Sequence, residues 1–366
     1  MLATGILTGF SVIIFNNGIH AIHDFSWEGV PLAGGDVIRN MEFDDPSLSW
    51  TILVTPMLGG LGVSGLRWLA GGLNTVPETV RGDDLKARVE RLRNAFRPVL
   101  KAVAAMVTLG TGASLGPEGP SVEIGKSVSQ SLQGLLRGNL SDTKRTALLA
   151  AGAAAGVGAG FNAAISGVFF AIENVLQKEQ QRKLKLRRRV DESSGSDDEA
   201  TEEEETTIVL VLLAAVTAAA VVQAGLGSEP AFRVPTFNLR SPLELPLYLV
   251  LGSLCGVVAG SFSFGCTLTS SFYNQLVDRG LPRWMLPAVG GLLTGIIALR
   301  YPEVLYEGFE NVNEIIRATP TVTTVVPEGT APPFQYGPEL LLELTLVKVQ
   351  AKGAASAAPG FPPAAG

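Results

Sequence analysis

The sequence predicts an all-α polytopic membrane protein in which several helices are broken. Three observations lead to this fold class. The mean hydropathy of the 366-residue chain is +0.30, and only 17% of its residues are charged. Glycine accounts for 42 of the 366 residues, about 11%, against roughly 7% in average proteins. The apolar stretches are rich in glycine and alanine, which is typical of helices that pack closely together in a bilayer.

Nine apolar stretches are candidates for membrane-spanning helices, since a span needs about 20 mostly apolar residues. Several are shorter and end at glycine or proline. Interrupted helices at membrane depth occur where they are buried in protein or line a wet cavity, so we expect the core of a transporter or channel. The expected spans are 1–22, 50–72, 98–115, 120–137, 145–160, 161–177, 206–227, 243–273 and 283–300, with a weaker tenth at 338–350.

Two basic stretches and one acidic stretch divide the chain. Residues 81–101 and 178–189 are rich in lysine and arginine, and the positive-inside rule places both on the cytoplasmic side, or on the stromal side in a plastid. Residues 191–205 carry nine acidic and no basic side chains, which predicts a disordered, solvated linker. The expected parts are a first transmembrane part at 1–177, a charged linker at 178–206, further transmembrane helices at 207–300, and a loop with a low-complexity tail at 301–366.

Two glycine-rich patterns resemble nucleotide-binding loops but do not fit that function. Residues 60–65, GLGVSG, match the dinucleotide-binding pattern, but they lie inside an apolar helical stretch with no preceding strand. Residues 119–127, GPSVEIGKS, end like a phosphate-binding loop, but the spacing of the glycines is wrong and Pro120 takes the required place. The net charge of −6 is no signature of nucleic-acid binding, and the sequence implies neither a cofactor nor an enzymatic reaction.

The histidines, cysteines and tryptophans are expected to have structural roles. His20 and His23 end the first span without a cysteine or carboxylate cluster at metal spacing, so we expect residues at the membrane interface and no metal site. Cys255 and Cys266 lie in an apolar stretch and are expected to be small packing residues without a disulfide. Indole rings favour the headgroup layer, and four tryptophans fall at or near span ends. They are Trp27, Trp50, Trp68 and Trp284.

The stretch GTGASLGPEGPSVEIGK, which starts at Gly110, sets one carboxylate among helix-breaking residues. Gly116 and Pro117 should break the preceding helix, and Pro120 suits the first turn of a new one, where its missing N–H needs no partner. The free N–H groups and the positive end of the helix dipole make an anion site at which Glu118 stands. We expect its carboxylate to occupy this site and to leave on protonation or when a permeant anion competes. The alternative is that Glu118 only caps a helix start.

The residues GPEGPSVEIGKSVSQ resemble the G-(K/R)-E-G-P motif of the CLC family of voltage-gated chloride channels and chloride/proton antiporters, with Pro117 at the usual lysine or arginine position. Residues 147–173, ALLAAGAAAGVGAGFNAAISGVFFAIE, are similar to the family's next two helices. The resemblance runs from about residue 1 to about residue 318. It implies the CLC-type inverted-repeat fold with broken helices, of which the chain holds the first repeat and the start of the second.

The resemblance also assigns roles to particular residues. Glu118 matches the family's gating glutamate, and its amide and that of Gly119 would line the outer anion site. Gly116 and Pro120 would shape the anion path. The family's G-S-G-I-P motif should fall near GGLNTVPE, where Asn74 stands in place of the anion-coordinating serine. An asparagine N–H can still donate to an anion, so binding need not be lost, but the selectivity among anions does not follow from the resemblance.

The expected transport mode depends on one further position. Family antiporters carry two consecutive glutamates after their F-N-A-P stretch, and the second passes protons to the cytoplasm. Here the pair reads Glu173-Asn174, and asparagine cannot titrate, so the inner proton relay is lost at Asn174. The resemblance therefore favours passive, voltage-gated channel-type conduction of chloride or another small anion. A proton-coupled antiporter that uses another internal acid is the alternative.

The family's third motif, G-x-F-x-P, has no clear match, and the nearest candidate is APGFPPA at 358–364. We therefore expect a truncated member, and the start within an apolar stretch, without a signal peptide, predicts missing upstream sequence. A non-conducting or modulatory fragment is the second alternative. The resemblance implies a multi-pass location in a lipid membrane and a homodimer in the full-length form. The acidic linker and Asn74 resemble plant and algal organellar members, such as those of the chloroplast.

Overall fold

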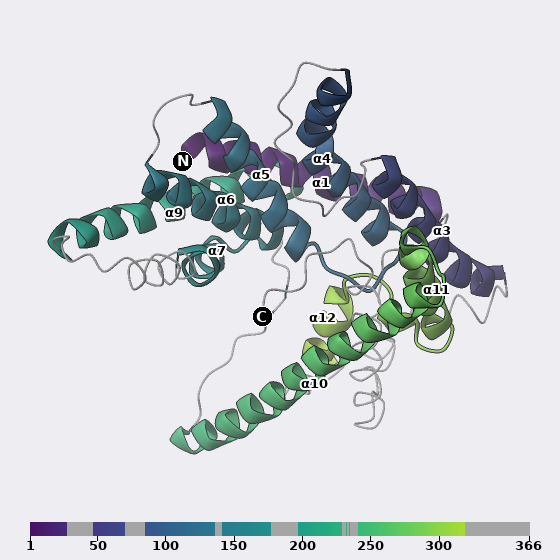
Figure 1. Cartoon of the computed structure of the whole chain (residues 1–366). Helices are drawn as coiled ribbons and strands as arrows, with labels where there is room; N and C mark the ends of the chain where they lie inside the picture. The colour runs from purple at the N-terminus through teal and green to yellow at the C-terminus, as the bar shows by residue number, and fades with distance from the viewer. Residues whose placement is uncertain are drawn as a thin grey trace. The chain divides into compact units, whose positions relative to one another are not determined.

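The computed structural model describes residues 1–27, 47–69, 85–135, 141–176, 197–228, 232, 234 and 241–318. Every regular element within these ranges is a helix (Figure 1). Contacts between residues divide the chain into two compact units. Unit 1 comprises Met1–Gly18, Asp83–Ala105 and Pro117–Ala231, and unit 2 comprises Ile19–Gly82, Met106–Gly116 and Phe232–Gly366.

The helices follow one another with short connections in the described ranges. The longer ones are α1 (Leu2–Ser26), α3 (Ser47–Leu69), α4 (Leu85–Gly110), α5 (Glu118–Leu135), α6 (Asp142–Phe161), α9 (Asp197–Leu226), α10 (Leu245–Asp278) and α11 (Leu286–Ala298). The shorter ones are α7 (Ala164–Ala171), α12 (Phe309–Ala318), the π-helix η1 (Ile172–Leu176) and the 3₁₀ helices η2 (Pro242–Glu244), η3 (Arg283–Met285) and η4 (Pro302–Val304).

Four helical segments in the described ranges are long and apolar enough to cross a membrane. Two more apolar segments are too short to do so, because a helix needs about 20 residues to cross the hydrocarbon core. This confirms the predicted all-α polytopic class. The long segments are Leu2–Ser26, Leu48–Trp68, Thr207–Leu226 and Pro242–Asp278, and the short ones are Ala164–Leu176 and Arg283–Ala298.

The helices α4, α5 and α6 overlap three further expected spans, at 98–115, 120–137 and 145–160, but do not reach the same combination of length and apolar character. Polar side chains on α4 and α5, and the glycines and charged first turn of α6, lower their hydropathy. Helix α6 packs against α5, α7 and α9, and a helix covered in this way does not need a uniformly apolar surface. The expected weak span at 338–350 lies outside the described residues.

Three helices begin or form where the sequence predicts loop. α4 begins at Leu85, inside the first basic stretch. α9 begins at Asp197, so residues 197–206 of the expected linker are helical. The second basic stretch, 178–189, and residues 190–196 of the linker lie outside the described residues. Acidic side chains are favoured at the positive end of a helix dipole, which accounts for a helix start among aspartates and glutamates. α12 occupies Phe309–Ala318, within the expected C-terminal loop.

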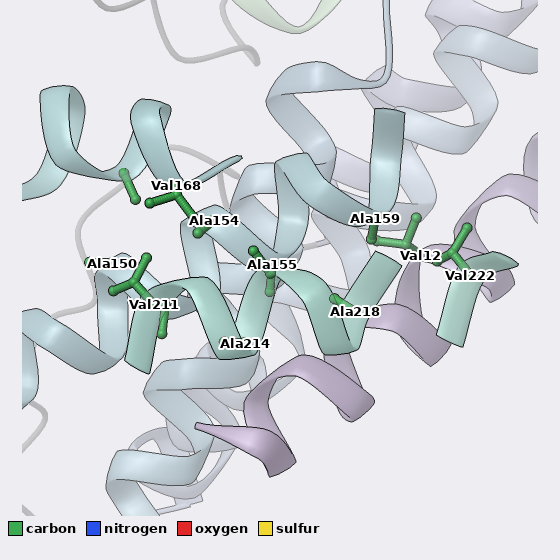
Figure 2. Close-up of a cluster of buried hydrophobic side chains, with 13 residues drawn as sticks. Val12, Ala150, Ala154, Ala155, Ala159, Val168, Val211, Ala214, Ala218 and Val222 are labelled. Atoms are coloured by element: carbon green, nitrogen blue, oxygen red, sulfur yellow. The ribbon is translucent and has the colours of Figure 1, made fainter. Parts of the chain in front are cut away.

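Small side chains form the core of unit 1. There α6 packs against α5, α7 and α9. The buried core members are all alanine or valine, so the helix axes approach closely, as the composition predicts. Figure 2 shows this cluster, which consists of Val12, Ala150, Ala151, Ala154, Ala155, Ala159, Val168, Ala171, Val211, Ala214, Ala215, Ala218 and Val222.

The helices α5 and α6 are in backbone contact along a row of small residues, here called the seam. A Cβ atom placed on Gly125 would lie 2.0 Å from the carbonyl oxygen of Gly152, and one on Gly156 would lie 2.3 Å from that of Ser121. No side chain larger than hydrogen fits at these glycines. The seam consists of Ser121, Gly125 and Ser129 on α5 and Gly152, Gly156 and Gly160 on α6, spaced four residues apart.

The seam also sets the directions of the two helices. Ser121, in the first turns of α5, contacts Gly156 and Gly160 near the end of α6. At the other end, the Gln133 side-chain amide donates to the carbonyl oxygen of Arg145, 3.1 Å away. The two helices are therefore antiparallel, with the start of α5 beside the end of α6.

Unit 2 is held by a similar contact and by an aromatic cluster. A Cβ on Gly60 of α3 would lie 2.3 Å from the carbonyl oxygen of Pro287 of α11, so these helices also touch through their backbones. Beside them, Trp27 and Tyr306 pack edge to face, with ring centroids 5.7 Å apart. Their cluster contains Trp27, Leu48, Ile52, Ala298, Leu305 and Tyr306.

Candidate functional site

The break between α4 and α5 is a tight turn that belongs to unit 2. α4 ends at Gly110, earlier than the expected span end at 115. Gly112 follows with φ +89°, and a Cβ there would lie 2.8 Å from the Trp27 ring, so only glycine fits. The Gly112 carbonyl oxygen accepts a hydrogen bond from the Tyr306 N–H at 3.4 Å. The half-buried Gly116 ends this segment.

The start of α5 belongs to unit 1 and carries the predicted carboxylate. α5 begins at Glu118, directly after Gly116 and Pro117, where the sequence predicts a new helix. The Glu118 and Gly119 side-chain positions are exposed, whereas Pro117 and Pro120 are buried. A Cβ placed on Gly119 would meet no atom within 4 Å. The backbone at the start of α5 is therefore open to a small molecule.

Two backbone N–H groups at this start have no partner within the helix. The first intrahelical hydrogen bond runs from the Ser121 N–H to the Pro117 carbonyl oxygen, at 2.9 Å. The amides of Glu118 and Gly119 precede it, and Pro120 has no N–H. Both amides lie at the positive end of the helix dipole. Such an end can hold one negative group, either a carboxylate or a small anion.

The structure describes the remaining predicted site residues only in part. Asn74 lies outside the described residues. Asn174 is half-buried in the π-helix η1, which continues α7, and the neighbouring Glu173 is exposed. π-Helical turns are rare and are often found at functional sites. No titratable side chain stands at position 174.

The structure shows one charge pair, between Lys101 and Glu123, that the sequence pattern does not predict. The Lys101 Nζ atom of α4 donates to the Glu123 Oε1 atom of α5, on the same helix as Glu118. Lys101 is the last of the basic residues at 81–101 and was expected only to orient the chain in the membrane. An acid on the helix that follows was the available signal, but the two residues are 22 positions apart in sequence.

His23 and Trp27, at the end of the first candidate span, are buried within the protein. The exposed fraction is 3% for His23 and 0% for Trp27. The His23 Nε2 atom is 3.2 Å from the Tyr306 hydroxyl, and its Nδ1 atom is 3.3 Å from the Asp24 carboxylate. Tyr306 itself has φ +61°, an uncommon conformation for a residue other than glycine. Burial of its ring raises the pKa of Tyr306 well above the usual value of a phenol.

Asn162, in the FNA stretch that resembles the family motif, ends α6 in the left-handed conformation with φ +54°. Its Oδ1 atom accepts from the Gln223 side-chain amide at 2.6 Å, and its Nδ2 atom donates to the Ser228 carbonyl oxygen at 3.4 Å. These bonds tie the end of α6 to the end of α9. Asn162 thus has a structural role within unit 1.

The sequence predicts no metal site among the described residues. In these ranges no group of three or more histidine, cysteine, aspartate or glutamate side chains comes together. Neither Cys255 nor Cys266 is in a disulfide; the first is exposed and the second is half-buried. The start of α5 itself offers two backbone N–H donors, the positive end of a helix dipole and a carboxylate.

Comparison with known proteins supports the resemblance seen in the sequence. A family model described as voltage gated chloride channel matches residues 66–359. The chain is 44% identical over 351 residues to chloride channel protein CLC-e of Arabidopsis thaliana. The matched region covers 95% of this chain and 44% of that relative. It is 41% identical over 316 residues to chloride channel protein CLC-f of the same plant, and this matched region covers 85% of this chain and 37% of that relative.

Solved structures show the same fold. A slow cyanobacterial Cl⁻/H⁺ antiporter matches with a TM-score of 0.63 and 17% identity, covering 98% of this chain and 74% of that one. A CLC-type fluoride/proton antiporter matches with a TM-score of 0.56 and 20% identity, with the same coverage of both chains. The chain spans less than half the length of the Arabidopsis relatives. The family match, the relatives and the fold together show that the chain belongs to the voltage-gated chloride channel (CLC) family.

Proposed function

We propose that this chain carries chloride or another small anion across a membrane, with Glu118 as the gate. The observation that carries the proposal is the start of α5, where an exposed carboxylate stands beside two backbone N–H groups without helical partners. The carboxylate and a permeant anion would compete for the same positive helix end. Gly116, Gly119 and Pro120 would shape the path, and Asn74 would supply a further donor.

We propose passive conduction as the transport mode. Asn174 supports this, because an amide cannot carry a proton where a family antiporter has its second glutamate. Proton-coupled exchange is the second candidate, and its support is that the similar solved structures include a Cl⁻/H⁺ antiporter and a fluoride/proton antiporter. A non-conducting or modulatory fragment stays the third prediction. A location in an organellar membrane, such as that of the chloroplast, stays a prediction. A homodimer of the full-length form also stays a prediction.

Chloride flux through vesicles that contain the purified 366-residue chain tests the proposal. We expect flux above that of empty vesicles, dependent on voltage and pH, and we expect Glu118→Ala to remove this dependence because the competing carboxylate is gone. Glu310→Ala is the matched control, since Glu310 is also an exposed glutamate in the first turn of a helix, α12. It should leave the flux unchanged.

Two outcomes decide between the candidates. Uphill chloride movement driven by an imposed pH gradient would establish proton-coupled exchange and refute passive conduction. No flux above empty vesicles, in the parent chain and in Glu118→Ala, would leave the non-conducting fragment as the correct alternative.

A further inference from the structure

The gate helix carries a second carboxylate that the proposed gating step does not use. Glu123 follows Glu118 by five residues, so a rise of about 1.5 Å per residue places it about 7.5 Å further along α5. Its carboxylate binds the ammonium group of Lys101 on α4. All three residues belong to unit 1.

The position of this pair calls for a functional reason. The exposed fractions of the side chains are 28% for Lys101 and 38% for Glu123, so neither charge is fully solvated. Ionisable groups are costly in the membrane-embedded part of a protein and usually mark the path of an ion. An ion pair with this much exposure contributes little to stability, so stability alone does not explain it.

Each of the two charges acts on an anion at the start of α5, and the two effects have opposite signs. The Debye length in physiological salt is about 8 Å, close to the axial distance between Glu123 and the helix start, and partly buried charges are screened less. The positive charge of Lys101 attracts an anion toward the free amides of Glu118 and Gly119, whereas the negative charge of Glu123 repels it. Together they nearly cancel.

We propose that Lys101 and Glu123 set the anion affinity at the start of α5, with Lys101 raising the affinity and Glu123 lowering it. This inference rests on the proposed function, because it concerns the same anion site. Conduction requires a site that binds an anion strongly enough to admit it and weakly enough to release it. An acid paired with the neighbouring lysine keeps the site in that range.

A purely structural pair predicts a different pattern. If the contact only holds α4 against α5, Lys101→Met and Glu123→Gln each leave a partner unpaired, and both should impair the protein. If the pair sets the local field, the two substitutions change the anion affinity in opposite directions. The double variant should then be close to the parent, because both charges are removed.

The experiment measures chloride binding to the full chain in detergent by equilibrium dialysis with radioactive chloride, and chloride flux in vesicles. Glu123→Gln should bind chloride more tightly and Lys101→Met more weakly, each by on the order of tenfold, because each removes one unit charge roughly 7.5 Å along the helix axis from the start of α5. The double variant should be within about twofold of the parent.

Lys144→Met is the matched control for the loss of one positive charge. Lys144 is exposed in the first turn of α6, which lies beside the end of α5 opposite to Glu118. It should leave chloride binding unchanged. Thermal unfolding of every variant separates altered affinity from misfolding, and if Lys101→Met does not fold, a gain in affinity in Glu123→Gln still supports the proposal.

The outcomes separate this inference from the proposed function. A change of chloride affinity in the same direction in Lys101→Met and Glu123→Gln, or no change of affinity in Glu123→Gln, would overturn the role of the pair. Chloride binding without flux would refute conduction, while the binding affinities would still decide the role of the pair. No chloride binding in any variant would overturn both.

Discussion

The seam between α5 and α6 predicts that Gly125→Ala destabilises unit 1. The added Cβ would lie 2.0 Å from the Gly152 carbonyl oxygen and 2.9 Å from its carbonyl carbon, whereas ordinary van der Waals contact begins at 3.4 Å. The two helices must therefore separate by about 1.4 Å at this point. Both contacting groups are backbone, so no change of side-chain rotamer can relieve the overlap.

The cost of this separation follows from close packing. Overpacking a well-packed interior by one methyl group costs about 1–3 kcal/mol, so we expect the free energy of unfolding to fall by about 2 kcal/mol in Gly125→Ala. The next contact along the seam, between Gly156 and Ser121, lies one turn from the start of α5 and would open with it. We therefore also expect altered gating of the anion flux.

Gly134→Ala provides the control on the same helix. A Cβ on Gly134 would meet no atom within 4 Å, and alanine is the better helix former by about 1 kcal/mol, so this variant should be as stable as the parent or slightly more stable. The measurement is denaturant-induced unfolding of the detergent-solubilised chain, followed by far-ultraviolet circular dichroism, because all four tryptophans lie in unit 2 and α5 and α6 lie in unit 1. Equal stability of Gly125→Ala and Gly134→Ala would show that the backbones of α5 and α6 are not in contact.

Two further predictions concern the buried polar contacts. Tyr306→Phe removes the hydroxyl that is 3.2 Å from the Nε2 atom of His23, and should lower the free energy of unfolding by about 1–3 kcal/mol because a buried ring nitrogen loses its partner. Burial raises the pKa of Tyr306, so above about pH 10 the phenol ionises in the unfolded chain first and the free energy of unfolding of the parent should fall as the pH rises. Tyr306→Phe should make this fall with pH less steep. An equally steep fall in Tyr306→Phe would contradict the burial of Tyr306. Asn162→Ala loses two hydrogen bonds and places alanine at φ +54°, so it should cost about 2–3 kcal/mol in thermal or denaturant unfolding. Asn162→Gly should recover only the part of the lost unfolding free energy that is due to the left-handed backbone conformation. Full recovery of the parent stability would refute a role for the two hydrogen bonds.

Local signals along the chain predicted the start of the candidate site correctly. Gly116, Pro117 and Pro120 restrict the backbone of their own neighbourhood, so the helix start at Glu118 could be placed from the sequence. Long apolar runs predicted α1, α3, α9 and α10 for the same reason, since length and hydropathy are properties of one segment.

Contacts between distant segments could not be placed in this way. His23 and Trp27 stand at the end of a span, but their local sequence does not show that Tyr306, 283 positions after His23, packs against both. The glycine content predicted close packing, but not that Gly125 faces Gly152. The basic residues near Lys101 in sequence predict only an orienting role for it, because its partner Glu123 lies on the following helix, 22 positions away.

The seam also has a consequence for the time course of gating. Backbone contact means that α5 cannot slide or tilt without moving α6, and such helix displacements take microseconds to milliseconds. The exposed side chain of Glu118 has no such constraint, and rotamer changes of exposed residues take picoseconds to nanoseconds. Opening at the start of α5 would then be a fast rotation of the Glu118 side chain, while α5 and α6 stay fixed to each other. The timing of single openings would depend on whether an anion or the Glu118 carboxylate occupies the site, and not on movement of the helices.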